Sequence, residues 1–320
     1  MNTPLRITAF AAVLAAAFGA AYGVGDVVDP IGSSAEPTAH AGHETTKTPD
    51  SGEESAEGGH ETPPDGLQVS ESGYSLDLET PRVSTAEKSG LRFVVRDSAG
   101  RIVTAYQREH GKELHLILAS RDLATYRHLH PIRSADGTWG VDAKLPAAGD
   151  YRLFADFTPA AKGAENLTLG ADLAVSGTYR PAPLPPITTV AEVEGYKVTL
   201  KGRLRPGVAD RLDLNVSKNG RPVTDLEPYL EAYGHLVALR SGDLAYLHVH
   251  PNGAPGDGKT KPGPTVSFTT TAPSSGSYRL FLDFKHNGKV RTASFTVDAG
   301  RAPHGTTPST APSSSAEHQH

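Results

Sequence analysis

The stretch HLILASRDLATYRHLHP at residues 115–131 recurs later in the chain as HLVALRSGDLAYLHVHP at residues 235–251. A second pair of segments also matches, GDYRLFADF at 149–157 and GSYRLFLDF at 276–284. Apolar residues in these segments form short runs that end at turn-forming residues such as Gly and Asp. The chain is therefore predicted to contain two copies of one folded unit.

The same short-run pattern extends through both copies. LRFVVRD at 91–97 is followed by SAG, and RLDLNVS at 211–217 is followed by KNG, which is typical of a strand followed by a turn. Neither copy contains a stretch with clear 3.6-residue periodicity. We therefore predict an all-β fold with two tandem immunoglobulin-like antiparallel β-sandwiches.

The predicted sandwiches occupy residues 67–180 and 188–300, and a proline-rich linker, PAPLPPI at 181–187, joins them. The His- and Glu-containing segment 26–66 and the tail 301–320 have almost no large apolar residues. Such segments cannot bury enough surface to offset the entropy of ordering, so both are predicted to be disordered.

Residues 1–25 form an apolar N-terminal segment with Arg6 near its start and no acidic residue. Its length lies between that of a signal-peptide core and that of a membrane-spanning helix. We expect a hydrophobic helix that is either a cleaved signal peptide or an uncleaved anchor in the cytoplasmic membrane. Both alternatives place the remainder of the chain outside the cytoplasm.

Composition limits the partners and the chemistry. The net charge of −5 and the lack of a basic stripe argue against nucleic acid. The chain has no cysteine, and Met1 is its one methionine, so sulfur ligands are excluded. A bound metal would be held by nitrogen and oxygen, which favours Cu(II), Zn(II) or Ni(II) over Cu(I).

Each copy carries three histidines in the pattern H-x12-H-x-H. Residues two apart in a strand point to the same face, and a hairpin would bring the first histidine opposite the third. Three imidazoles placed in this way can bind one ion with bonds of about 2.0–2.1 Å. The predicted metal ligands are His115, His128, His130, His235, His248 and His250.

Asp156 and Asp283 lie in apolar strands, where a carboxylate needs a partner. We expect each to orient one of the metal-binding histidines through a hydrogen bond; alternatively, they face solvent at the strand end. The histidines themselves have an alternative structural role, with their rings hydrogen-bonded to the backbone at a corner of the sandwich.

Two long segments carry a resemblance to a known group of proteins. DGTWGVDAKLPAAGDYRLFADF at 136–157 and RPVTDLEPYLEAYGHLVALRSGDLAYLHVHP at 221–251 resemble secreted or membrane-anchored proteins of high-GC bacteria. The domains of that group are similar to YtkA-like and FixH-like modules of immunoglobulin type. The resemblance implies a location in the cell envelope and a link to copper handling, but it assigns no functional residues.

The sequence thus favours an extracytoplasmic, non-catalytic protein that binds Cu(II) or Zn(II) for sequestration or delivery. The alternative is a cell-surface structural or protein-interaction module whose histidines are structural, with a protein partner that the sequence does not identify. A zinc hydrolase is disfavoured, because the chain contains neither G-x-S-x-G nor H-E-x-x-H.

Overall fold

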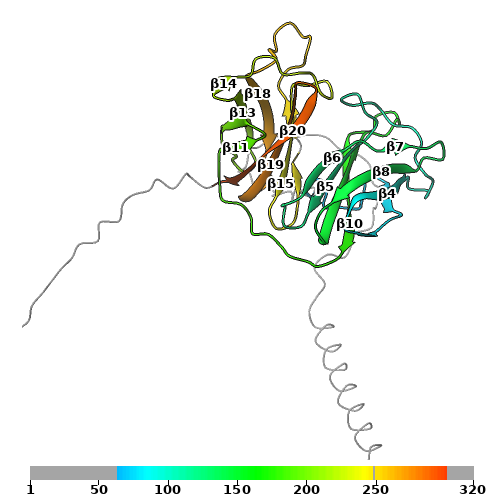
Figure 1. Cartoon of the computed structure of the whole chain (residues 1–320). Helices are drawn as coiled ribbons and strands as arrows, with labels where there is room; N and C mark the ends of the chain where they lie inside the picture. Colours follow the sequence, from blue (N-terminus) through cyan, green and yellow to red (C-terminus); the bar gives the residue numbers. More distant parts are fainter. Residues whose placement is uncertain (1–62, 248, 301–320) are drawn as a thin grey trace, which may run out of the picture. The chain divides into compact units, whose positions relative to one another are not determined.

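The computed structural model describes residues 63–247 and 249–300. Within these residues every helix or strand is a β-strand, which confirms the all-β prediction (Figure 1). The predicted N-terminal helix at 1–25, most of the predicted linker 26–66 and the tail 301–320 lie outside the described residues. Among the residues that are described, none belongs to a helix long and apolar enough to cross a lipid bilayer.

The first sandwich has two sheets with an apolar core between them. In one sheet the order is β1 (Ser70–Glu71), β2 (Tyr74–Leu78), β4 (Ala86–Arg96), β8 (Trp139–Leu145) and β7 (Ile132–Arg133). In the other it is β3 (Arg82–Ser84), β10 (Leu167–Ser176), β9 (Gly149–Phe157), β5 (His115–Ser120) and β6 (Tyr126–Leu129). Phe93 and Leu116 are fully buried in this core, and burial of such a side chain contributes about 1.5–3 kcal/mol.

The second sandwich repeats this arrangement. One sheet has the order β11 (Val190–Val193), β12 (Tyr196–Lys201), β13 (Ala209–Lys218), β18 (Thr265–Thr271) and β17 (Val249–Pro251), with β14 (Arg221–Pro222) paired to β13. The other has the order β16 (Tyr246–Leu247), β15 (His235–Arg240), β19 (Gly276–His286) and β20 (Lys289–Ala299). A separate apolar core lies between these sheets, so each repeat is a sandwich of its own.

The strand order is that of the immunoglobulin fold. Lettered in chain order, β2, β4, β8 and β7 are strands A, B, E and D, while β5, β9 and β10 are strands C, F and G. In the second sandwich β12, β13, β18 and β17 form the A-B-E-D sheet, and β15, β19 and β20 form the C-F-G sheet. The prediction of antiparallel sheets needs one addition, since β3 pairs in parallel with β10.

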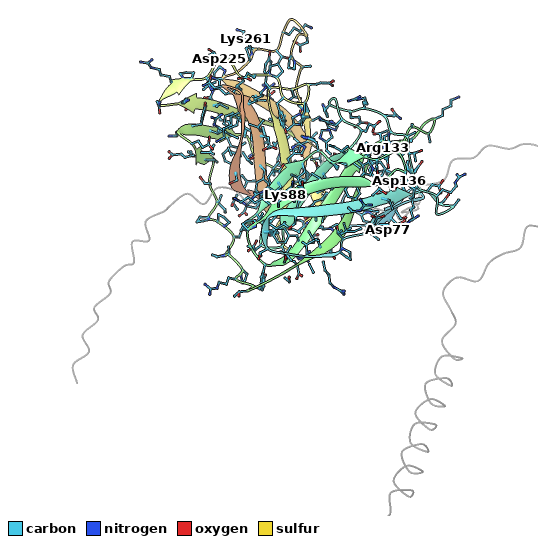
Figure 2. All side chains as sticks on the ribbon, turned by 45° about the vertical axis from the view of Figure 1, so that its right-hand side comes forward. Asp77, Lys88, Arg133, Asp136, Asp225 and Lys261 are labelled. Carbon is cyan, nitrogen blue, oxygen red and sulfur yellow. The ribbon has the colours of Figure 1, made fainter. Side chains whose placement is uncertain are left out.

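The outer faces of the two kinds of sheet differ. Strand β13 alternates exposed and buried residues, as expected when one face of a sheet meets water. Charged side chains such as Asp77, Lys88 and Arg133 stand on the A-B-E-D sheet of the first sandwich (Figure 2). In contrast, all six residues of β5 are buried, so this strand of the C-F-G sheet is covered on both faces.

The covering layer on the C-F-G sheet is the other sandwich. A third apolar cluster combines residues of β5, β6 and β9 with residues of β15, β16 and β19. Tyr126 stacks on Phe281 with ring centroids 4.1 Å apart, and Phe154 lies 5.6 Å from Tyr246. These are equivalent positions in the two repeats, so the same contact is made twice with the roles of the sandwiches exchanged.

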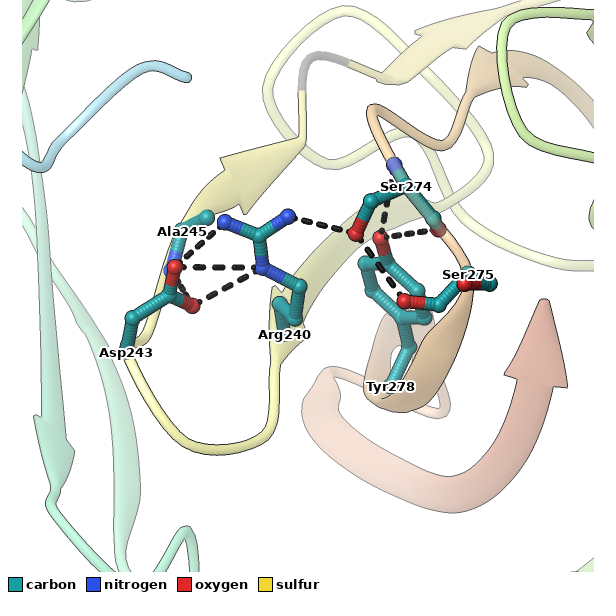
Figure 3. Close-up of polar contacts among 6 residues, drawn as sticks. All are labelled: Arg240, Asp243, Ala245, Ser274, Ser275 and Tyr278. Atoms are coloured by element: carbon teal, nitrogen blue, oxygen red, sulfur yellow. Dashed lines mark hydrogen bonds and ion pairs between the residues drawn. The ribbon is translucent and has the colours of Figure 1, made fainter. Parts of the chain in front are cut away.

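Each sandwich is closed at one end by a tyrosine corner. The hydroxyl of Tyr151 donates to the carbonyl of Ala147 at 2.9 Å, and the hydroxyl of Tyr278 donates to the carbonyl of Ser274 at 2.8 Å. Figure 3 shows the second of these beside Arg240, whose guanidinium reaches Ser274. A tyrosine near the start of strand F that bonds a few residues upstream is a mark of this fold.

Candidate metal centre between the two sandwiches

The hairpin of β5 and β6 sets the position of the first histidine triplet. Leu116 pairs with Leu129 and Ile117 pairs with His128, which is the register that the histidine spacing predicts. The strands are joined through residues 121–125, where Leu123 adopts a left-handed backbone with φ of 57°. This conformation is costly for a branched residue, and it places the buried Leu123 side chain in the cluster between the sandwiches.

Two of the imidazoles turn one ring nitrogen each toward the other. His115 Nε2 lies 3.2 Å from the carbonyl oxygen of Glu109, and His128 Nδ1 lies 3.0 Å from a carboxylate oxygen of Asp283. Both nitrogens must carry the ring proton, because their partners are acceptors. The remaining nitrogens, His115 Nδ1 and His128 Nε2, are 3.1 Å apart, and in neutral rings both have a lone pair.

His130 completes a three-nitrogen group. One ring nitrogen from each of His115, His128 and His130 lies within 4.8 Å of the other two. His130 Nε2 is buried and has no hydrogen-bond partner among the described residues. Tetrahedral bonds of 2.0–2.1 Å place ligand nitrogens about 3.3 Å apart, so His115 and His128 already have suitable spacing. The chemistry of these donors fits Zn(II) or Cu(II).

Burial keeps the rings in the neutral form that binds metal. Desolvation, assisted by the neighbouring imidazoles, lowers the pKa of His115 to about 3. Burial, assisted by nearby imidazoles and the Lys112 ammonium, lowers the pKa of His130 to about 4. Burial also lowers the pKa of His235 to about 4. At neutral pH these side chains therefore do not have to lose a proton before they coordinate an ion.

The two aspartates predicted to orient histidines occupy different environments. Asp283 lies in β19 of the second sandwich, yet its hydrogen bond goes to His128 of the first. Asp156 accepts a hydrogen bond from Asn166 at 2.8 Å, and it lines a cavity of about 270 Å³. The predicted contact of Asp283 with a histidine is thus present, and the packing of the sandwiches supplies that histidine from the other repeat.

The second triplet is arranged differently from the first. His235 begins β15 and its Nε2 lies 2.9 Å from the carbonyl of Leu230, as expected for a ring that donates to the backbone. His250 lies in β17, which belongs to the opposite sheet and pairs there with β18. His248 lies outside the described residues. Both His235 and His250 line the cavity that Asp156 also lines.

The early change of sheet explains this difference. In the first sandwich β6 continues to Leu129, whereas β16 ends at Leu247 and the chain enters β17 at Val249. Val249 packs against the core of the second sandwich. His250 therefore lies in the sheet opposite to that of His235, in a strand whose partly buried Val249 packs against the core.

The structure adds residues that were not predicted from the sequence. His110 lies 5.2 Å from His235 and 6.2 Å from His115, measured between ring centroids. Tyr229 lies about as close to His130 and His235, at 6.1 Å and 5.9 Å. His110 has no counterpart in the second repeat, where Leu230 stands at the equivalent position. Comparison of the two repeats therefore could not have identified it. Histidines of both sandwiches thus gather at one place.

In another loop with the spacing of a binding motif, the backbone N–H groups already donate to an aspartate of the same loop. GAPGDGKT at 253–260 has the spacing of a phosphate-binding P-loop, but strand β18 follows it where a P-loop needs a helix. The carboxylate of Asp257 accepts backbone hydrogen bonds from Ala254, Lys259 and Thr260 at 2.6–3.1 Å. A phosphate would need these same backbone N–H groups as donors. Because they already donate to Asp257, the loop is not a nucleotide site.

The family of the chain is shown by its two repeats. The model for the domain of unknown function DUF8832 matches residues 68–169 and again residues 191–301. The chain belongs to the DUF8832 family. The two matches correspond to the two sandwiches, but the resemblance to YtkA-like and FixH-like modules is not confirmed. No curated protein matches the chain.

Several solved structures are similar at low identity. FdeC, an Escherichia coli adhesin, is 15% identical over 72% of this chain and 64% of its own, with a TM-score of 0.22. InvD of Yersinia pseudotuberculosis is 11% identical over 75% of this chain and 62% of its own, with a TM-score of 0.24. Invasin, a bacterial integrin-binding protein, is 11% identical over 70% and 39%, with a TM-score of 0.20. This chain spans less than two thirds of each, and the fold assignment comes from the strand order.

Proposed function

We propose that the protein is an extracytoplasmic, non-catalytic metal-binding protein that holds Cu(II) or Zn(II) through His115, His128 and His130. One observation carries this proposal: His115 Nδ1 and His128 Nε2, the ring nitrogens that do not bond Glu109 or Asp283, face each other at 3.1 Å. Two lone pairs repel at this distance unless a positive charge lies between them. The orphaned nitrogen of His130 provides a third donor to the same space.

Burial lowers the pKa of His115 to about 3, so this ring does not supply a proton to the space near neutral pH. A divalent cation suits it better, since the hydrogen bonds to Glu109 and Asp283 fix both tautomers for coordination. In this proposal the apolar N-terminal segment exports the chain, and holds it at the membrane if it stays uncleaved. His235, His248 and His250 remain proposed ligands for a second ion.

Metal titration of the full chain tests the proposal. With Cu(II), we expect the electron paramagnetic resonance spectrum to show hyperfine splitting from several nitrogen ligands. Isothermal titration calorimetry should show one high-affinity site. Because the tails also contain histidine, the H128A and H130A variants identify the site by losing the tight component. H286A is the matched control: the His286 side chain is 9% exposed, against 6% for His128, but it bonds Tyr196 and Asp225 in the second sandwich. Unchanged affinity in H128A and H130A would rule out this site.

A second candidate function is favoured by the contact between His128 and Asp283. This hydrogen bond joins the sandwiches, and the two side chains are 6% and 3% exposed. In a structural or protein-interaction module the histidines would serve to hold the tandem domains together. The wild-type chain would then bind no ion tightly, while H128A would still lower the free energy of unfolding. The same titration therefore separates the two functions.

A further inference from the structure

Asp283 is the point at which the second sandwich reaches the histidine cluster of the first. It is 2% exposed and lies in β19. One carboxylate oxygen accepts a hydrogen bond from Thr292 Oγ1 at 2.5 Å, and the other accepts from His128 Nδ1 at 3.0 Å. Thr292 of the second sandwich thus fixes the position of the carboxylate. The hydrogen bond that this carboxylate accepts orients the His128 ring of the first sandwich.

We infer that a divalent cation at His115, His128 and His130 fastens the two sandwiches together, with Asp283 as the positioning residue that links the ion to the second sandwich. This inference rests on the proposed metal site. It adds that neither sandwich holds the ion with full affinity alone, so metal binding and sandwich packing depend on each other.

The link acts through the two nitrogens of one imidazole. An ion on His128 Nε2 withdraws electron density from the ring, which makes Nδ1–H a stronger donor to the Asp283 carboxylate. In return, the carboxylate makes the ring a better ligand and fixes its tautomer. Loss of such a partner typically weakens metal affinity 10–100-fold. Because linkage is reciprocal, the bound ion favours the packed arrangement by the factor by which packing strengthens ion binding.

The surrounding contacts make the link sensitive to packing. Tyr126, two residues before His128, stacks on Phe281, two residues before Asp283. Separation of the sandwiches would therefore break the aromatic stack and the hydrogen bond together. Once hydrated, His128 would be free to adopt the other tautomer, and the group of three nitrogens would lose its fixed geometry.

A comparison of two buried carboxylates in the full chain tests the positioning role. We expect D283N to bind Zn(II) 10–100-fold more weakly than wild type, measured against a competing chelator. D210N is the control, because Asp210 is 6% exposed in the same sandwich but bonds Arg205 instead of a histidine. Its Zn(II) affinity should stay within threefold of wild type. Equal affinities for D283N and wild type would overturn the inference, whereas no Zn(II) binding by wild type would overturn the proposed function itself.

A second measurement does not depend on the D283N variant folding. The chain has no cysteine, so S98C and E192C place one spin label on each sandwich at exposed positions. Zn(II) should narrow the distribution of distances between the labels in the otherwise wild-type chain, and H286A should respond in the same way. A distribution that does not change while Zn(II) binds would show that the ion does not fasten the sandwiches.

Discussion

Tyr126 of the first sandwich stacks on Phe281 of the second with ring planes only 4° apart. The equivalent residues Tyr246 and Phe154 form the reciprocal pair, with ring planes 40° apart. Tyr126 and Phe281 each stand two residues before a partner of the hydrogen bond between His128 and Asp283. The sandwiches thus join through apolar faces that a lone immunoglobulin-type domain would expose to water, and the histidine cluster forms where these faces meet.

Removal of the tighter aromatic pair should destabilise the chain. Phe281 is 3% exposed, so F281A is expected to lower the free energy of unfolding by about 3 kcal/mol. In a double-mutant cycle with Y126A, the coupling energy should be about 0.5–1.5 kcal/mol. Urea denaturation followed by circular dichroism measures both values. Strict additivity of the two substitutions would contradict the stacking contact.

His130 should have opposite effects on stability in the absence and presence of metal. A buried polar atom without a partner costs about 1–3 kcal/mol, so H130L should raise the unfolding free energy of the metal-free protein by about 1 kcal/mol. With Zn(II) present, the wild-type chain should gain stability from binding and H130L should gain less. Thermal unfolding with chelator and with Zn(II) measures the two cases.

The control for this prediction is H286L. Both ring nitrogens of His286 have partners, Tyr196 at 2.7 Å and Asp225 at 3.1 Å. Its replacement should therefore destabilise the protein under both conditions. If H130L destabilised the metal-free chain as much as H286L does, His130 Nε2 would have a partner in solution, and the argument from its orphaned state would fail.

The sequence carried more information on the fold than on the contact between sandwiches. Alternation in segments such as RLDLNVS predicted strands with one wet face, and β13 has that pattern. HLILAS does not alternate, and an unbroken apolar run indicates a strand that is covered on both faces. The apolar run can be read from the sequence, but it does not identify the part of the protein that covers the second face of the strand.

The candidate site was predictable only where it depends on local register. The spacing of His115, His128 and His130 placed them together because one hairpin contains all three. Asp283 contacts His128 across 155 positions, through a packing of domains that no local pattern encodes. His250 shares the spacing of His130, but its strand pairs with β18 in the other sheet, where Val249 packs against the core.

Acid should destabilise the metal-free protein before its carboxylates titrate. Burial lowers the pKa of His115 from 6.5 to about 3 and that of His235 to about 4. Between these values and pH 6.5 the unfolded chain binds more protons than the folded chain, so stability is complete above pH 6.5 and falls as the pH decreases. Urea midpoints measured with chelator should decline from pH 7 to pH 4.5.

The contribution of a single ring to this pH dependence can be isolated with H130N. The pKa of His130 is lowered to about 4, so its replacement should make the decline in midpoint less steep. A midpoint that stays constant across this range in wild type would mean that the rings are hydrated and hence not clustered. Added Zn(II) should steepen the decline, since protons then also compete for the ligands.

The tyrosine corners should stabilise the two sandwiches without affecting the metal site. Y151F and Y278F each remove one hydroxyl that donates to a backbone carbonyl, at Ala147 and Ser274. Each should lower the free energy of unfolding by about 1 kcal/mol, more if the carbonyl stays buried without a donor. Y179F is the control, because Tyr179 is 54% exposed and the change in unfolding free energy should be near zero.

The buried Trp139 reports on unfolding of the first sandwich. In Y151F the midpoint of its fluorescence transition should therefore move to a lower urea concentration, while the Zn(II) affinity stays at the wild-type value. A weaker Zn(II) site in Y151F would instead mean that the corner and the histidine cluster, at different positions along the first sandwich, are coupled through β9.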